Sequence, residues 1–248
     1  MATDIAPALL EQIQKRFQSR MMGDRELARI SNKIRDGTAT LYDGHFYSVR
    51  TGKHLSEALR DVLTEDDLPN GTLYFNIANR TVVPALKETY GIVNDIDSQI
   101  QSAVDVKAKI GLRAVAADFP EERIKGLIDK MTEEGIEFDE VLKWLGEPII
   151  NNTEAFHDDF IKENARFRES VGLKSKIIRR AEANCCDWCA NLEGSYDYGN
   201  VPPEVYARHE YCRCDVVFES GRSRQNVWSK ESWSSTPEQI EARKEAGR

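Results

Sequence analysis

Apolar residues recur every three or four positions along most of residues 1–172, which is the spacing of one buried face of an α-helix. Two such runs lie near the start of the chain, and Asp24 falls where the N-cap of the second helix is expected. The apolar residues of these runs are Leu9, Leu10, Ile13 and Phe17, then Leu27, Ile30 and Ile34. The pattern predicts a mainly α fold with a helical bundle-like body.

A change of pattern between residues 38 and 49 predicts a short β-hairpin. Residues 38–42 and 45–49 carry aromatic and β-branched side chains on both sides of Asp43 and Gly44, a pair that favours two-residue hairpin turns. A leucine-containing helix is expected next. The stretch 64–71, which is rich in Asp, Pro and Asn, then ends this first unit.

Helical periodicity continues over residues 73–171, and residues 82–110 form either one long helix or a broken one. Pro120 precedes two glutamates, as at the start of a helix, where proline and acidic side chains are both favourable. Gly146 and Gly172 are expected at two helix ends. This part of the chain is therefore predicted to be almost entirely helical.

The composition narrows the class of protein. The 248 residues include 34 Lys and Arg against 42 Asp and Glu, which gives a formal net charge of −8. This charge excludes a protein that coats nucleic acid along its whole surface, but it allows a local basic contact. No apolar run reaches the roughly 18 residues of a membrane span, and the amino end does not form a signal core. We expect about one or two domains, made and folded in a cytoplasm.

Residues 173–180 carry four positive charges and no negative one, which makes them a local basic patch. Two interpretations are open. In one, a helix packs Leu173, Ile177 and Ile178 inward and leaves the charges solvated. In the other, the charges contact phosphate or an acidic partner surface. The residues concerned are Lys174, Lys176, Arg179 and Arg180.

All five cysteines lie between residues 185 and 214. Cys186 and Cys189 form a Cys-x-x-Cys pair, and His209 begins a His-x-x-Cys-x-Cys sequence after about 19 residues. An odd number of thiols without an export signal argues against a disulfide framework. Zinc prefers four tetrahedral sulfur or nitrogen ligands, and both spacings suit one ion. The sequence therefore predicts a structural Zn²⁺ site held by Cys186, Cys189, His209 and one or both of Cys212 and Cys214.

The exact ligand set stays open. Cys185 is the weakest candidate, because it adjoins Cys186 and breaks the two-residue spacing. Cys212 has the better spacing from His209, whereas Cys214 begins an apparent strand. Unligated thiols, a redox pair and a catalytic zinc are the other interpretations. The order of elements is not that of a thioredoxin, and the order of the ligands is not that of a zinc deaminase.

The cysteine region resembles the carboxy-terminal region of phage head-morphogenesis or minor head proteins, the family related to protein F of phage Mu. In that family a Cys-x-x-Cys, a Leu-x-Gly and a His-x-x-Cys-Arg-Cys follow a helical part in this order. The matching residues are Cys186, Cys189, Leu192, Gly194, His209, Cys212, Arg213 and Cys214. Glu210 departs from the family, which usually has Pro after the histidine. The resemblance covers residues 150–220.

The resemblance implies a structural protein present in few copies in the virion, at the portal vertex or the capsid interior, that acts in head assembly or DNA delivery. The implied partners are the portal protein, the major capsid protein and packaged DNA, which the basic patch would contact. No membrane partner and no catalytic residue is expected. A rival from another class is a zinc-dependent enzyme such as a phage nuclease, in which His209 or Glu210 acts at a metal-bound water.

The remaining histidines and tyrosines are expected to be surface or packing residues. His45, His54 and His157 occur without a nucleophile pattern. The tyrosines near the cysteines could stack on bases, but packing over the metal site is the favoured interpretation. These tyrosines are Tyr196, Tyr198 and Tyr206.

These signals divide the chain into four parts. They are an amino-terminal helical segment with the hairpin (1–71), a helical body (72–172), a zinc-binding carboxy-terminal module (173–235) and a flexible tail (236–248). Trp228 and Trp233 are expected to anchor the end of the module to the body.

Overall fold

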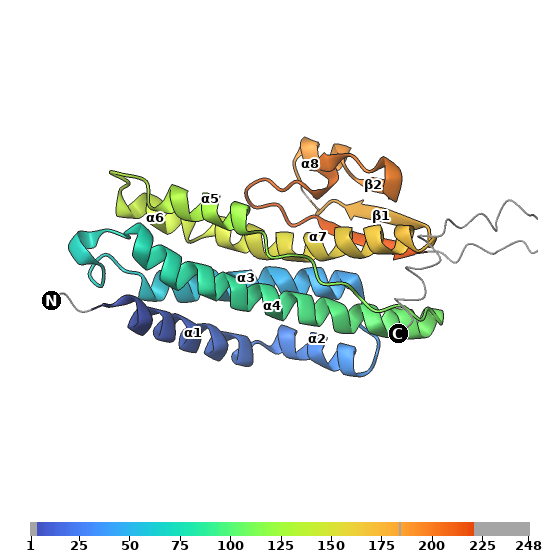
Figure 1. Cartoon of the computed structure of the whole chain (residues 1–248), viewed down its shortest axis with the longest axis horizontal. Coiled ribbons are helices and arrows are strands. Elements are labelled where there is room, and N and C mark those ends of the chain that lie inside the picture. Colours follow the sequence, from blue (N-terminus) through green and yellow to red (C-terminus); the bar gives the residue numbers. More distant parts are fainter. Residues whose placement is uncertain (1–3, 184, 221–248) are drawn as a thin grey trace, which may run out of the picture.

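Most of the described residues are helical, and a small sheet lies along one of the helices (Figure 1). The computed structural model describes residues 4–183 and 185–220; Trp228, Trp233 and the predicted tail lie outside these residues. The predicted fold class, mainly α with a bundle-like body and a small α+β module, is confirmed. The helices are α1 (Ala6–Gly23), α2 (Arg25–Arg35), α3 (Leu41–Val62), α4 (Phe75–Ala108), α5 (Glu121–Met131), α6 (Phe138–Trp144), α7 (Glu147–Ser170) and α8 (Asp187–Asn191). The strands are β1 (Ser175–Arg180), β2 (Gly194–Asp197) and β3 (Asp215–Ser220), and short 3₁₀ turns cover Pro69–Gly71, Tyr198–Asn200 and Pro203–Tyr206.

The predicted hairpin between residues 38 and 49 is wrong, because this segment is the first part of α3. Thr40 is the N-cap, and its hydroxyl accepts from the Asp43 backbone N–H while the Asp43 carboxylate accepts from the Thr40 backbone N–H. This capping box satisfies two backbone donors at the helix start. Asp43 and Gly44 therefore begin a helix, although the same pair favours a turn between strands.

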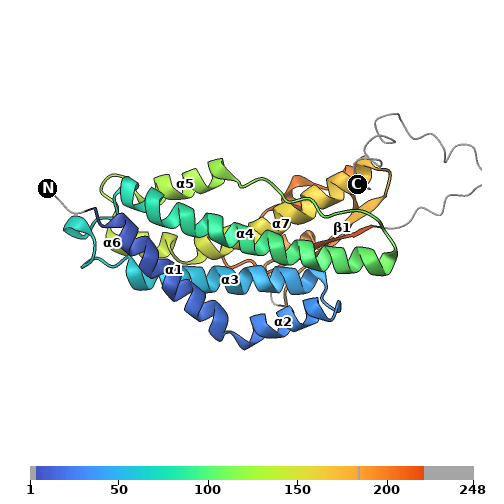
Figure 2. The same cartoon turned by 60° about the horizontal axis from the view of Figure 1, so that its bottom comes forward.

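Four long helices, α1, α3, α4 and α7, pack around the main core (Figures 1 and 2). The core extends from Leu9 of α1 to Phe156 of α7, so the predicted segments 1–71 and 72–172 share it. The helices α3 and α7 approach each other closely at Gly52, where an added Cβ would lie 2.9 Å from Ile150 Cα. Among the described residues, no helix combines the length and the apolar character needed to cross a membrane.

The helix ends predicted at Pro120, Gly146 and Gly172 agree with the structure, but residues 109–120, which were expected to be largely helical, form a connection without helix. One helix, α4, runs unbroken from Phe75 to Ala108 with Pro84 inside it. Pro120 caps α5, and α7 begins just after Gly146 with Pro148 in its first turn, where proline is tolerated. Gly172 follows α7 with a positive φ of 82°, a conformation that glycine adopts without strain.

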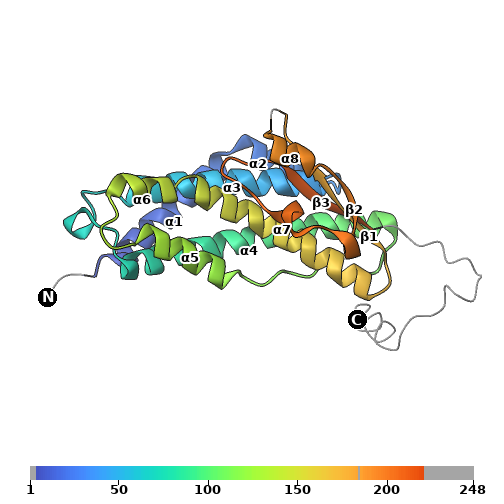
Figure 3. The same ribbon diagram turned by 90° about the horizontal axis from the view of Figure 1, so that it is seen from above.

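A three-stranded antiparallel sheet in the order β2-β1-β3 packs against the carboxy-terminal half of α7 (Figures 1 and 3). Ile177 in the central strand pairs with Tyr196 of β2 and Phe218 of β3. These strands and α7 enclose a second core around Phe160, Ile177 and Val216. The strand that the sequence indicates after Cys214 is β3. The proposed helix at 173–180 is wrong, since most of this segment is β1.

Candidate metal centre

Two short turns bring the cysteines together. Cys186 is the N-cap of α8 and Cys189 lies within it, so one helical turn places both sulfurs on the same side. The second turn precedes β3, where the Cys212 backbone N–H donates to the His209 carbonyl at 3.1 Å. Tyr211 in this turn has a φ of 61°, which is uncommon for a residue with a bulky side chain. Each sequence motif thus forms a tight turn that ends in ligand side chains.

The two turns meet at Cys189. Its sulfur lies 3.0 Å from His209 Nε2 and 3.8 Å from Cys212 Sγ, and Cys186 Sγ lies 3.3 Å from the same histidine nitrogen. Two sets of side chains could hold a metal ion among the described residues. They are Cys186, Cys189 and His209, and Cys189, Cys212 and Cys214, with ligand atoms within 4.8 Å of one another in each set.

Each of the five predicted ligands lies in one of the two sets, and Cys189 lies in both. Cys185 packs beside the cluster but belongs to neither set. Cys212 and Cys214 are both buried and both lie in the set with Cys189. The structure therefore does not distinguish Cys212 from Cys214 as a ligand, and neither does the sequence spacing.

His209 is oriented for ligation by its own backbone. Its Nδ1 lies 2.6 Å from the Glu210 carbonyl oxygen, which can only accept a hydrogen bond. The proton therefore belongs on Nδ1, and the unprotonated Nε2 faces the cysteine sulfurs. This is the tautomer that an Nε2 metal ligand requires.

Arg179 lies behind the cysteines and not on the surface, which corrects its assignment to a phosphate or partner contact. Its side chain is fully buried, with Nη1 donating to the carbonyls of Val205 and Ala207 at 2.6 and 3.1 Å. Its Nη2 lies 3.6 Å from the sulfurs of both Cys189 and Cys212. Alternate residues of a strand face opposite sides, and position 179 faces inward. A buried guanidinium here would help to compensate negative charge on these sulfurs once they are deprotonated.

Three members of the basic patch do share an exposed face. Lys174, Lys176 and Arg180 stand at alternate positions of the strand and its approach, and all three are exposed. Lys176 Nζ lies 3.7 Å from the Asp197 carboxylate, and the Arg180 guanidinium lies over the Tyr42 ring at 4.3 Å. The predicted strip is therefore a face of three cations.

The pKa values of the thiols are shifted in opposite directions, by a hydrogen bond at Cys186 and by burial at Cys189 and Cys212. The Cys189 backbone N–H donates to the Cys186 sulfur and lowers the pKa of that thiol. Burial raises the pKa of Cys189 to about 12, and burial also raises the pKa of Cys212. A bound cation would supply the positive charge that buried thiolates need, and its binding would release protons.

A second group of buried charged residues was missed in the sequence. Arg208 and Arg213 flank the ligands His209 and Cys212, and both insert against α7. Their partners there are Glu147, Glu154 and Asp158, all buried. Burial raises the pKa of Glu154 to about 7, although both arginines lower it. The spacing of seven and then four residues, which places these carboxylates on one helix face, was the available signal.

His45 and His157 lie beside these buried charged residues. Their ring centroids are 5.8 Å apart, and both side chains are buried, as expected for packing residues. His157 Nδ1 lies 2.9 Å from an Asp97 carboxylate oxygen, and its Nε2 lies 3.2 Å from the Val216 carbonyl oxygen. The Val216 carbonyl can only accept, so Nε2 carries a proton, and an ionised Asp97 favours a second proton on Nδ1. Burial lowers the pKa of His157, but Asp97 more than offsets this and raises it above its ordinary value.

The tyrosines near the cysteines do not cover the group of potential metal ligands. Tyr196, Tyr198 and Tyr206 pack against the core enclosed by the sheet and α7. The aromatic ring beside the cluster belongs to Trp188, whose centroid lies 5.8 Å from the His209 ring. The predicted packing role is thus filled by a residue inside the Cys-x-x-Cys pair.

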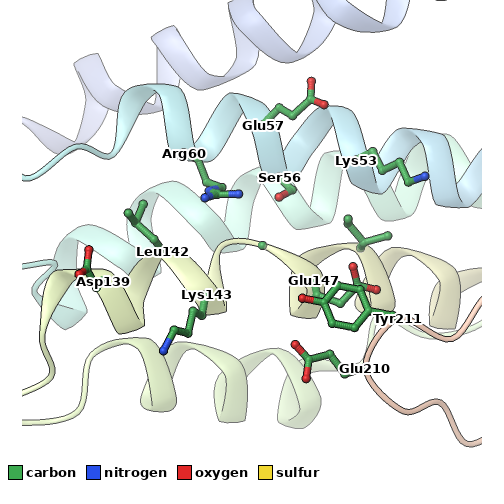
Figure 4. A pocket seen from close by; sticks show the side chains of 12 residues that line it. Lys53, Ser56, Glu57, Arg60, Asp139, Leu142, Lys143, Glu147, Glu210 and Tyr211 are labelled. Carbon is green, nitrogen blue, oxygen red and sulfur yellow. The ribbon is translucent and has the colours of Figure 1, made fainter.

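Beside the ligand turn, a groove of about 740 Å³ opens between α3, α6 and the start of α7. Figure 4 shows Arg60, Lys143 and Glu210 around it. Glu210 lines this groove, and it belongs to neither set of potential metal ligands among the described residues.

Comparison of the chain with protein-family models, with curated proteins and with solved structures found no match.

Proposed function

We propose that the chain is a phage minor head protein, a structural component that acts in head morphogenesis at the portal vertex or the capsid interior. The observation that carries this proposal is the clustering of Cys186, Cys189, His209 and Cys212, in which the Cys189 sulfur lies near both His209 Nε2 and Cys212 Sγ. These residues belong to the motif that resembles the minor head proteins. Leu192 and Gly194, also in that motif, continue from α8 into β2, where the Leu192 carbonyl accepts from the Tyr196 hydroxyl at 3.0 Å.

Zinc is the metal that suits these ligands. A tetrahedral zinc ion with bonds of about 2.3 Å to sulfur holds two sulfurs about 3.8 Å apart. Cys189 and Cys212 have this separation, 3.8 Å. The sulfur-to-nitrogen distances to His209 are 3.0 and 3.3 Å, which a small outward movement of the ring would adapt to a bound ion. Thiolate and imidazole ligands together favour zinc over the hard cations.

A structural role for the metal depends on how many of the five candidate side chains bind it. The two sets of three share Cys189. If four of these side chains hold one ion, its tetrahedral positions are filled and none is left for an activated water. Glu210, the residue that a hydrolytic mechanism would use as a base, lines the neighbouring groove. The ion would instead fix the two turns that connect the sheet to α7.

The partner in the virion would meet the exposed face formed by Lys174, Lys176 and Arg180. Cations on one exposed face suit either packaged DNA or an acidic surface of the portal or major capsid protein. Arg179 is not part of this contact, because it is buried behind the cysteines.

Co-assembly tests the proposal. The full chain is expressed with the portal and major capsid proteins encoded by neighbouring genes, and assembled heads are separated from free protein by sedimentation. We expect the chain in the head fraction, with Cys189→Ser absent from it and Cys185→Ser retained, since Cys189 belongs to both sets of potential ligands and Cys185 to neither. A wild-type chain found only in the free fraction would contradict the proposal. Plasmid cleavage by the purified protein that is abolished in Glu210→Ala would favour the nuclease instead.

A further inference from the structure

Two arginines connect the turn at residues 208–214, which we call the ligand turn, to the helical body. Arg208 Nε and Nη2 donate to the two carboxylate oxygens of Asp158 at 2.5 and 2.8 Å, and Arg208 Nη1 donates to the Cys214 carbonyl at 3.0 Å. Arg213 Nη1 lies 2.7 Å from Glu147 and 3.1 Å from Glu154. Each arginine thus joins the ligand turn to α7 through charged contacts.

These contacts are shielded from water. The side chains of Arg208 and Asp158 are 4% and 3% exposed, and that of Glu154 is fully buried. A buried ion pair that loses one partner leaves an uncompensated charge, which is strongly unfavourable. The carboxylates of α7 therefore depend on arginines whose positions are set by the ligand turn.

The buried charged residues around Arg208 and Arg213 also contact residues of two further helices, α3 and α4. His45 of α3 has its Nε2 3.5 Å from both the Glu154 and the Asp215 carboxylates. His157 connects Asp97 of α4 to the Val216 carbonyl of β3. An added Cβ at Gly44 would lie 2.2 Å from an Asp97 carboxylate oxygen, so α3 and α4 are packed tightly at this point. These buried charged residues are therefore continuous from the ligand turn into the body.

We infer that the metal centre acts as a latch on the helical body: metal binding holds Arg208 and Arg213 against α7, and metal release lets this part of α3 and α7 open. The inference rests on the metal site of the proposed function. Arg208 adjoins His209, and Arg213 lies between Cys212 and Cys214, so a bound ion would fix the turn from which both arginines extend. Without the ion, the turn is free to leave, and the buried carboxylates then gain by becoming hydrated. Metal occupancy would thereby control the rigidity of one region of the bundle, a property suited to a protein that must change its contacts during assembly.

Coupling of this kind is reciprocal, so weakening the latch also weakens the metal site. Asp158→Asn removes the charge opposite Arg208 without touching a ligand, and we expect it to lower zinc affinity about 10-fold. The matched control is Asp159→Asn, the next residue of the same helix, whose partner Arg123 lies at the surface. This variant is expected to change zinc affinity by less than about twofold.

Hydrogen exchange of the full wild-type chain, with zinc and after chelation, tests the latch and needs no variant. We expect chelation to speed exchange about 10-fold or more in residues 45–52 of α3 and 147–158 of α7, with α1 and α5 unchanged. Faster exchange confined to residues 181–214, or spread over every helix, would overturn the latch. Zinc content measured on the same sample separates the two hypotheses. A chain that retains no zinc contradicts the proposed metal site itself, whereas bound zinc without a response in α3 and α7 contradicts the latch alone.

Discussion

Arg179 Nη2 lies 3.6 Å from Cys189 Sγ, so the positive charge next to the metal cluster comes from the central strand of the sheet. Arg179→Gln is therefore expected to lower zinc affinity about 10-fold or more, as loss of a group that supports the ligands typically does. Arg180→Gln is the control, because Arg180 is exposed on the opposite side of the same strand. Competition with a zinc chelator measures both affinities. Equal affinities in the two variants would show that Arg179 does not support the thiolates.

The exposed cations of the sheet are expected to supply any DNA contact that the chain makes. If Lys174, Lys176 and Arg180 each neutralise a phosphate, replacing all three by Ala reduces the slope of log K against log salt by about 0.9 for each phosphate that is no longer neutralised. Fluorescence anisotropy with duplex DNA at several salt concentrations measures this slope. Binding that the triple variant leaves unchanged would assign the face to a protein partner.

Gly52 allows the close approach of α3 to α7. Gly52→Ala places a Cβ 2.9 Å from the Ile150 Cα, and backbone cannot move aside as a flexible side chain can, so we expect a decrease of about 2 kcal/mol in the free energy of unfolding. Gly91→Ala in α4 is the matched control, because an added Cβ there meets nothing within 4 Å. Its higher helix propensity should stabilise the chain by about 0.5–1 kcal/mol. Urea denaturation measures both variants, and a neutral Gly52→Ala would contradict the packing.

Asp24 makes stability depend on acid pH. Burial raises its pKa, but hydrogen bonds from Arg50, His54 and two backbone amides of α2 outweigh burial and lower the pKa to about 2. Because the folded pKa lies below the unfolded value of about 3.9, this stabilisation is complete above pH 4 and is lost as the pH falls through about 2. Asp24→Ala should cost about 2 kcal/mol at neutral pH, since it removes both the cap and the charged contacts.

Asp24→Asn is the matched control for this effect, because Asn is also a good N-cap but carries no charge. Its stability should fall less steeply than that of the wild type between pH 4 and pH 2. Thermal unfolding at several pH values makes the comparison. Parallel curves for the two proteins would show that the charge of Asp24 contributes nothing.

The helices after residue 73 could be predicted from the sequence because local signals and packing agree there. Pro120, Gly146 and Gly172 stand where helices begin or end, and the apolar periodicity between them is regular. The hairpin predicted for residues 38–49 is wrong because Asp43 and Gly44 are as common in a hairpin turn as they are suitable for this helix start. The capping box of Thr40 and Asp43, and the packing of Gly44 against Asp97 far away in the sequence, distinguish the helix from the hairpin.

The cluster of potential metal ligands could be predicted because its members are close together in sequence and their spacing reflects the turn that each pair needs. The arginines around it could not be assigned in the same way. Whether Arg179 faces the cysteines or the solvent depends on the register of β1 between β2 and β3. Arg208 and Arg213 meet carboxylates about 50 residues or more away, and such pairs leave no local pattern beyond the helical spacing of the carboxylates.

Metal content of the native chain tests the central claim most directly. Elemental analysis of the purified full-length protein should give about one zinc ion per chain in the wild type and in Cys185→Ser, and almost none in Cys189→Ser, whose sulfur is shared by both ligand sets. Less than about half an equivalent of zinc in the wild type, with freely reactive thiols, would contradict the metal centre.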